Sequence, residues 1–224
     1  MLRSQWGLSA SASGGNTRAA SATFTGEAVR QTDDSKWGFT TRANYAHADA
    51  GTTAANVYAG TQYDHNFADM PLFAFGKLDY LRDKPANIES RFSAYGGLGR
   101  HLLRDDDNSW DVFGGLGYTQ DRYVIPADVG GELRSSYGRL EGVLSETSSH
   151  KLTPTTSARQ KFEIYPNLRV GGQFRTVIDL GLAVAITDRL QLTTGLIHRF
   201  DSDPGIGLKN NDVLFVTGIA VRFE

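Results

Sequence analysis

Residues 71–83 read P-L-F-A-F-G-K-L-D-Y-L-R-D, residues 90–101 read S-R-F-S-A-Y-G-G-L-G-R-H, and residues 109–119 read S-W-D-V-F-G-G-L-G-Y-T. In each run one set of alternate residues is apolar or small, and the other set includes polar side chains such as Lys77 and Asp79. A period of two predicts a β-strand with one apolar and one polar face. Aromatic residues near the ends of the apolar face, with small residues between them, are typical of strands that cross a bilayer.

The composition favours a single β domain that spans residues 1–224. Glycine is abundant and proline sparse, and no low-complexity segment or shift in composition marks a linker. Cysteine is absent, which excludes disulfides and thiolate metal sites, and the net charge of -2 gives no sign of nucleic-acid binding. No run of about 18 apolar residues is present, so a membrane-spanning helix is excluded, whereas the strands of a membrane barrel are only half apolar.

The same alternation continues along the rest of the chain. It predicts about twelve strands joined as successive hairpins, the first over residues 5–13 and the fourth near residues 53–65. We therefore expect an all-β fold, a closed antiparallel up-and-down transmembrane β-barrel, with an even strand number as in bacterial single-chain barrels. If both termini are periplasmic, the longest loops, near residues 124–132 and 203–205, lie on the outside.

Large aromatic residues gather at two levels of the predicted apolar face, and all three tryptophans fall at one of them. The predicted membrane-interface residues are Trp6, Trp37, Trp110, Tyr63 and Phe223 on the periplasmic rim, and Tyr45, Tyr80, Phe92, Tyr118, Phe162 and Phe174 on the external rim. The alternative is a soluble β-sandwich or barrel with its apolar face turned inward. That alternative explains less well why aromatic residues stand at strand ends and small residues between them.

The surroundings of the protein follow from the membrane interpretation. No charged segment followed by an apolar one precedes the first strand, so we expect an export signal to have been removed. The mature chain is then expected in the outer membrane, in contact with the bilayer and lipopolysaccharide, after insertion by the barrel-assembly machinery. We expect a monomer with no nucleic-acid partner.

Four short motifs carry a resemblance to a known family: S-G-G-N-T at residues 13–17, L-F-A-F-G-K-L-D-Y-L-R-D at 72–83, F-E-I-Y-P-N-L at 162–168, and R-F-D-S-D-P-G at 199–205. In this order and spacing the chain resembles the salt-induced outer membrane protein family, also called YdiY-like, a domain of unknown function 481. One departure is Glu224 after Phe223, since outer-membrane strands of this kind usually finish on the aromatic residue. The resemblance implies an outer-membrane barrel, but no established activity, cofactor or catalytic residue.

Charges of opposite sign nearly balance on the predicted polar face, which would line the lumen. The predicted lumen-lining residues are Arg42, Lys77, Asp79, Asp111, Arg139, Glu141, Arg159, Lys161, Glu163, Arg175, Asp179 and Arg199. Such residues can pair across strands in a purely structural role or line a hydrated path for small polar solutes. Because the same wall combines bulky tyrosines with many glycines, we expect either a narrow passive pore with weak charge selectivity or a structural barrel with a plugged lumen.

Catalysis and metal binding have weaker support. The five histidines show no metal-ligand spacing, and Asp201, Asp203 and Asp212 do not match a calcium loop, so no metal or cofactor is expected. His198 and Ser202 near the external rim could form a lipid-hydrolase site, but no G-x-S-x-G motif accompanies them. We therefore expect no catalytic residues.

Overall fold

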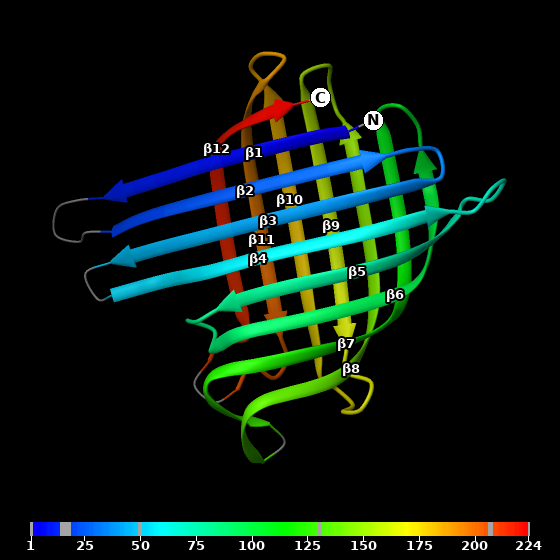
Figure 1. Cartoon of the computed structure of the whole chain (residues 1–224). Helices are drawn as coiled ribbons and strands as arrows, with labels where there is room; N and C mark the ends of the chain where they lie inside the picture. Colours follow the sequence, from blue (N-terminus) through cyan, green and yellow to red (C-terminus); the bar gives the residue numbers. More distant parts are fainter. Residues whose placement is uncertain (1, 14–18, 49–50, 130, 206–207, 224) are drawn as a thin grey trace.

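The alternating segments form strands that close into a ring (Figure 1). The computed structural model describes residues 2–13, 19–48, 51–129, 131–205 and 208–223. Among these residues each strand pairs antiparallel with the next, and the predicted closed, all-β, up-and-down barrel is confirmed. The twelve strands in the described residues are β1 (Leu2–Ser13), β2 (Ala19–Gln31), β3 (Ser35–Ala48), β4 (Gly51–Asn66), β5 (Leu72–Asp83), β6 (Ile88–Arg104), β7 (Asn108–Val129), β8 (Glu132–Lys151), β9 (Thr156–Pro166), β10 (Phe174–Ala185), β11 (Leu190–Asp201) and β12 (Asn211–Phe223).

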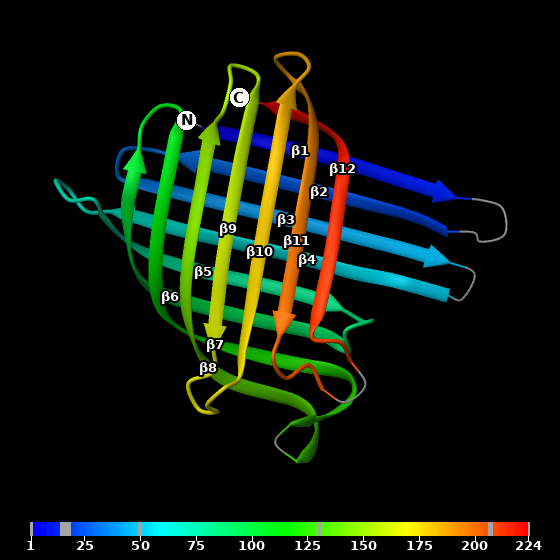
Figure 2. The same ribbon diagram turned by 180° about the vertical axis from the view of Figure 1, so that it is seen from behind.

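The first and last strands complete the ring. β1 and β12 pair antiparallel, from Ser4 opposite Phe223 to Leu8 opposite Ile219. β1 begins and β12 ends at the same end of the barrel in both views (Figures 1 and 2). Pairing β1 with β12 leaves no free edge along this seam, so the backbone groups of the paired residues bond within the sheet. Among the described residues, no helix has the length and apolar character needed to cross a membrane.

The two faces of the sheet differ sharply in chemistry. Within β5, Leu78 is 58% exposed, whereas the neighbouring Lys77 is 5% exposed. On β7, Leu116 is exposed while Asp111 and Phe113 are buried. Leucine, valine and aromatic side chains therefore form the exterior, and charged side chains point inward, as alternation along a strand requires.

The loop expected near residues 124–132 is mostly strand. β7 continues to Val129 and β8 begins at Glu132, so their hairpin projects beyond its neighbours (Figure 1). Asn87 fastens this extension, because its Oδ1 accepts the N–H of Ile125 at 2.9 Å and its Nδ2 donates to the Ile125 carbonyl at 3.0 Å. Pro126 falls within the register shift between Arg122 and Ala127, where a ladder N–H is not needed.

Two other expectations concern turns and ends. A long connection does follow β11, as expected near residues 203–205, and it leads to β12 at Asn211. Residues 14–18, which hold most of the first family motif, and Glu224 lie outside the described residues.

A cluster of side chains fills the interior beside β5–β9. Its members are Phe73, Phe75, Tyr95, Phe113, Val143 and Tyr165. The rings of Phe75 and Phe113 lie 4.6 Å apart, and those of Tyr95 and Tyr165 lie 5.1 Å apart. We call these six residues the aromatic cluster.

Glycines at the paired positions of the neighbouring strands make room for this cluster, with Gly99 opposite Phe73 and Gly117 opposite Tyr95. A Cβ on Gly99 would strike the ring of Phe73, and a Cβ on Gly117 would strike the ring of Tyr95. The sequence suggests that glycines widen the lumen, but at these two positions the freed volume is occupied by aromatic rings. In an interior packed this closely, adding even one methyl group displaces neighbouring atoms and lowers the stability of the fold.

Candidate functional site in the barrel interior

The interior holds two cavities. The large cavity, of about 910 Å³, is lined in part by the connections after β5 and β11, which lie at the end of the barrel away from the termini. The small cavity, of about 310 Å³, is lined by Lys36, Asp64 and Asp111, which stand near the turns at the other end. Both cavities lie inside the ring of strands, between groups that the sequence predicts to face inward.

The two cavities meet at a set of side chains that line both. This shared ring comes from β3, β4, β5, β9 and β10, and consists of Thr40, Tyr58, Asp79, Lys161, Glu163 and Asp179. It contains three carboxylates and one ammonium group, while Lys77 and Arg42 stand beside it as partners of these carboxylates. With these partners included, opposite charges balance where the cavities meet.

Lys77 holds the shared ring together. Only 5% of this residue is exposed, and its Nζ donates to Glu163 Oε1 at 2.5 Å and to the Tyr165 hydroxyl at 2.7 Å. Asp79 Oδ2 lies 3.3 Å from the same Nζ, and Asp79 Oδ1 accepts a 2.7 Å hydrogen bond from the Tyr58 hydroxyl. A buried ammonium group is satisfied in this way by several acceptors, which offsets its loss of hydration.

Two further contacts join strands on opposite sides of the barrel. Arg42 on β3 donates to Asp179 on β10 at 3.0 Å, although β11, β12, β1 and β2 lie between these strands in the ring. Arg159 on β9 donates to Glu27 on β2. These cross-barrel pairs run through the interior instead of along its wall, and they narrow the space around the shared ring.

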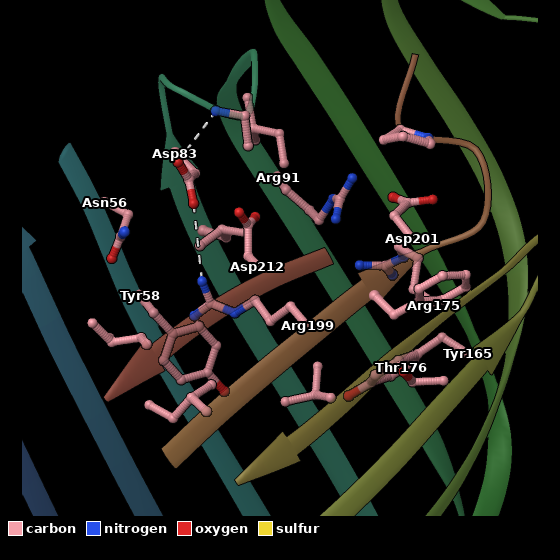
Figure 3. A pocket seen from close by; sticks show the side chains of 18 of the residues that line it. Asn56, Tyr58, Asp83, Arg91, Tyr165, Arg175, Thr176, Arg199, Asp201 and Asp212 are labelled. Carbon is pink, nitrogen blue, oxygen red and sulfur yellow. Dashed lines mark hydrogen bonds and ion pairs between the residues drawn. The ribbon is translucent and has the colours of Figure 1, made fainter. Parts of the chain in front are cut away.

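A third cross-barrel contact is looser. Arg199 on β11 lies 3.9 Å from Asp83 on β5, with β12, β1, β2, β3 and β4 between these strands (Figure 3). At this distance the charges attract, but no hydrogen bond forms. This contact crosses the large cavity.

A buried network of ion pairs lies on the wall formed by β6–β8 and β10. Asp121, which is fully buried, accepts two bonds from Arg91 at 2.6 and 2.8 Å and one from Arg139 at 2.9 Å. Glu141, 1% exposed, accepts from Arg139 at 2.8 Å and from Arg175 at 2.7 Å. The hydroxyls of Tyr95 and Thr119 also donate to Glu141. Both carboxylates are therefore fully engaged.

The charged residues predicted to line the lumen all lie on the walls of the two cavities. Most of them belong to the buried network, to the shared ring with its partners, or to the cross-barrel pairs. Asp111 lies apart, with its Oδ1 2.6 Å from His101 Nδ1. The structure also adds Arg91 to the network and Phe73, Phe75 and Tyr165 to the interior, and none of these four is among the predicted lumen-lining residues. The alternation does predict that these side chains face inward. Arg91 is two residues from Ser93 and Tyr165 is two residues from Glu163, so each points to the same face of its strand as that inward residue.

Most predicted interface aromatics are exposed on the outer face. Tyr80 and Phe174 are half-buried, because Tyr80 packs on Phe92 at 4.9 Å and Phe174 on Phe200 at 5.4 Å. Phe162 lies in the middle of β9, opposite Ile178 on β10, and not at a strand end. The others exposed on this face are Trp6, Trp37, Tyr45, Tyr63, Phe92, Trp110, Tyr118 and Phe223.

His198 and Ser202 engage separate partners. A ring nitrogen of His198 lies 2.9 Å from Asn211 Oδ1, and the Ser202 hydroxyl accepts the N–H of Phe174 at 2.8 Å. A hydrolase needs its base to hydrogen-bond the nucleophile, and no such bond links these two described side chains. Within the described part of the chain no three histidine or carboxylate groups are placed to hold a metal ion.

The fold is similar to that of several solved structures at low sequence identity. The translocator domain of the autotransporter NalP from Neisseria meningitidis is 14% identical, with a TM-score of 0.49, and the match covers 100% of this chain and 88% of that one. The NanC porin is 13% identical, with a TM-score of 0.49 and coverage of 99% and 97%. The KdgM porin is 8% identical, with a TM-score of 0.49 and coverage of 100% of both chains. Similarities at this level say nothing about what this chain binds or transports. No curated protein matches the chain, whereas a family model described as "Protein of unknown function, DUF481" matches residues 6–223.

Proposed function

The chain belongs to the DUF481 family of proteins of unknown function, and we propose that it is an outer-membrane barrel that acts as a narrow passive pore for small polar solutes or ions. The observation that carries this proposal is the pair of cavities, about 910 and 310 Å³, that meet at the shared ring inside a closed barrel. Cavities lined by charged and hydroxyl groups admit water, and water-filled polar paths conduct small solutes.

The exterior supports the membrane location. Large apolar side chains such as Leu98, Leu116 and Phe215 are more than half exposed, and a soluble monomer rarely presents so much apolar surface. A closed barrel satisfies its backbone hydrogen bonds internally, which the hydrocarbon region of a bilayer requires. We propose that the exterior contacts lipid directly, as a monomer, after insertion by the barrel-assembly machinery.

The chemistry of the shared ring suggests weak selectivity. Asp79, Glu163 and Asp179 are offset by Lys77, Lys161 and Arg42 at contacts of 2.5 to 3.3 Å. An ion passing this point meets both signs of charge at similar range, so neither cations nor anions gain a large advantage. In a barrel of between about eight and sixteen strands the side chains decide how wide the lumen is. Here they leave two cavities that share six lining residues, which supports a narrow pore over a wide one.

A structural barrel with a plugged lumen is the second candidate. It is favoured by the aromatic cluster, which fills the side of the interior next to β5–β9, and by the cross-barrel pairs. This candidate predicts no conductance. A lipid-hydrolase function is not proposed, because His198 contacts Asn211 and Ser202 contacts Phe174.

Reconstitution into planar bilayers tests the pore. Folded protein, identified by its altered gel migration before boiling, should give small, voltage-tolerant conductance steps. Removing the cross-barrel pair in the double variant Arg42→Ala/Asp179→Ala should enlarge these steps, because two side chains leave the path together with no net change of charge. Truncating Arg159 and Lys161 should also enlarge them and shift the preference toward cations.

The matched control removes an ion pair outside the lumen. Lys151, at the end of β8, and Asp107, in the turn between β6 and β7, pair at 2.8 Å, and both side chains are about half exposed. The double variant Lys151→Ala/Asp107→Ala should therefore leave the conductance steps unchanged. If folded protein gives a silent bilayer, and both sets of lumen truncations stay silent, the pore is excluded and the structural barrel remains.

A further inference from the structure

The polar side chains on the wall of the large cavity differ in the number of hydrogen bonds that they make. In the buried network every carboxylate accepts several short hydrogen bonds, whereas Asn56, Arg199 and Asp212 make no side-chain hydrogen bond to any described residue. Asp83, beside them, accepts one 3.4 Å bond from the Ala86 N–H. Figure 3 shows these four side chains facing the same part of the cavity.

Strand pairing brings these four side chains together. Asn56 on β4 stands directly opposite Asp83 on β5, and Arg199 on β11 stands directly opposite Asp212 on β12. Arg199 reaches across the cavity toward Asp83 and stops at 3.9 Å (Figure 3). One guanidinium group therefore lies between two carboxylates and hydrogen-bonds to neither. We call Asn56, Asp83, Arg199 and Asp212 the open cluster.

The open cluster offers donors and acceptors together. Arg199 has five N–H donors, Asp83 and Asp212 are acceptors, and the Asn56 amide is both. A hydroxyl group donates one hydrogen bond and accepts others, so adjacent hydroxyls can bridge a carboxylate and a guanidinium separated by about 4 Å. The ring of Tyr58 lies beside Arg199 and supplies an apolar face (Figure 3).

The charge of the cavity narrows the class of ligand. Its wall carries more carboxylates than cationic groups, and Asp83 and Asp212 flank the Arg199 guanidinium. An anionic ligand on Arg199 would sit close to these two negative charges, which disfavours it. A neutral ligand avoids that repulsion.

We propose that the large cavity binds a neutral, hydroxyl-rich solute, a short sugar, with its hydroxyls bridging Arg199 to Asp83 and Asp212. The cavity volume of about 910 Å³ lies within the range of roughly 300–1,000 Å³ that is usual for ligand sites. The proposal rests on the proposed pore, because it names the class of solute that the pore would admit. Binding can nevertheless be measured without conduction.

Calorimetric titration of the folded chain with maltose tests the proposal. The detergent must have no sugar head group, so that it does not compete for the cavity. Maltose should bind saturably, and glucuronate, an anionic sugar, should bind more weakly. Arg199→Gln and Asp212→Asn should each weaken maltose binding about tenfold, since each removes a hydrogen bond to a charged group.

Lys36→Gln is the matched control. Lys36 also lies 3.9 Å from a carboxylate, that of Asp111, but it lines the small cavity, so its loss should leave maltose binding unchanged. Because Asp212 is exposed, Asp212→Asn should fold even if Arg199→Gln does not.

Several results would overturn the proposal: no saturable maltose binding, tighter binding of glucuronate than of maltose, or equal losses in Lys36→Gln and Asp212→Asn. Conductance without maltose binding removes this inference and leaves the pore. Maltose binding without conductance removes the pore and leaves the binding site.

Discussion

The half of the barrel interior formed by β5–β9 and the half formed by β10–β12 with β1–β4 are built differently. The first contains the aromatic cluster and most of the buried network, with Phe73, Asp121 and Glu141 at most 1% exposed. The second presents many short side chains to the interior, including Thr40 and Gly181. The packed half supplies cohesion, and the open half borders the space that the proposed pore would use. In this proposal a well-packed half and an open half share one barrel.

The strongest test of this difference between the two halves is to remove one carboxylate from each and compare the losses in the free energy of unfolding. Glu141→Leu leaves Arg139 and Arg175 buried without their shared partner, and losing one member of a buried ion pair costs roughly 3–5 kcal/mol. Glu27→Leu breaks a partly exposed pair with Arg159, for which a cost below about 1 kcal/mol is expected. Urea unfolding in lipid vesicles measures both free energies.

Comparable losses in the two variants would show that the halves do not differ in cohesion. Glu141→Gln refines the measurement, since the amide keeps one acceptor for the surrounding donors and should fall between Glu141→Leu and the unmodified chain.

Arginine substitutions sharpen the comparison and extend it to the outer face. Leu116→Arg and Leu180→Arg place a charge on the exposed apolar surface and should each cost roughly 2–4 kcal/mol in a bilayer. Thr23→Arg, in the open half, should be tolerated, because Thr23 lines the large cavity and its hydroxyl donates to Asn44 at 3.1 Å, outside the buried network. Folding efficiency in vesicles of defined thickness gives the measurement.

Ser93→Arg supplies the contrast within the interior. Ser93 is about as buried as Thr23, but its hydroxyl lies 2.8 Å from that of Thr119, which donates to Glu141 in the buried network. An arginine there should therefore impair folding, although the position faces inward. Equal tolerance of arginine at Ser93 and Thr23 would contradict the division into halves, and equal tolerance at Thr23 and Leu116 would contradict the assignment of faces.

The smallest expected effect is at the turn that joins β6 to β7, outside the membrane-spanning strands. The Asp105 carboxylate accepts the N–H groups of Asp107 at 2.9 Å and Asn108 at 2.7 Å, and these bonds hold the pKa of Asp105 below its usual range. A lowered folded pKa means that the carboxylate stabilises the fold at neutral pH and loses this contribution as the pH falls below about 3.9.

Asp105→Ala should therefore lower the thermal midpoint slightly at pH 7, and the difference from the unmodified chain should shrink in acid. Asp106→Ala, at the adjacent position, is the control. A difference that stays constant from pH 7 into acid would show that the turn is held by its backbone alone.

Alternation along the chain was enough to predict the barrel, its strand phase and the inward charges, because side-chain direction in a strand is a local property. In the run L-F-A-F-G at residues 72–76 both faces are apolar, so the inward position of Phe73 and Phe75 is set only by the phase of Lys77 and Asp79. The extended β7–β8 hairpin was missed because Pro126 and the following glycines are typical of a loop.

The cross-barrel pairs could not be predicted from spacing. Arg42 and Asp179 are 137 positions apart in the chain, and no local pattern relates them. Their contact depends on the diameter and shear of the closed ring, which are properties of the whole sheet. The open cluster is hidden for the same reason, because its members come from four strands at distant points in the chain.

The cross-barrel pairs also have a mechanical consequence. A closed sheet in which each strand contacts only its two neighbours can flatten under lateral pressure, because the bending is distributed over many backbone dihedral angles. The ion pairs Arg42–Asp179 and Arg159–Glu27 span the barrel interior, so flattening of the barrel would stretch or compress them. The barrel should therefore resist deformation of its cross-section in a compressed bilayer for as long as both ion pairs remain intact.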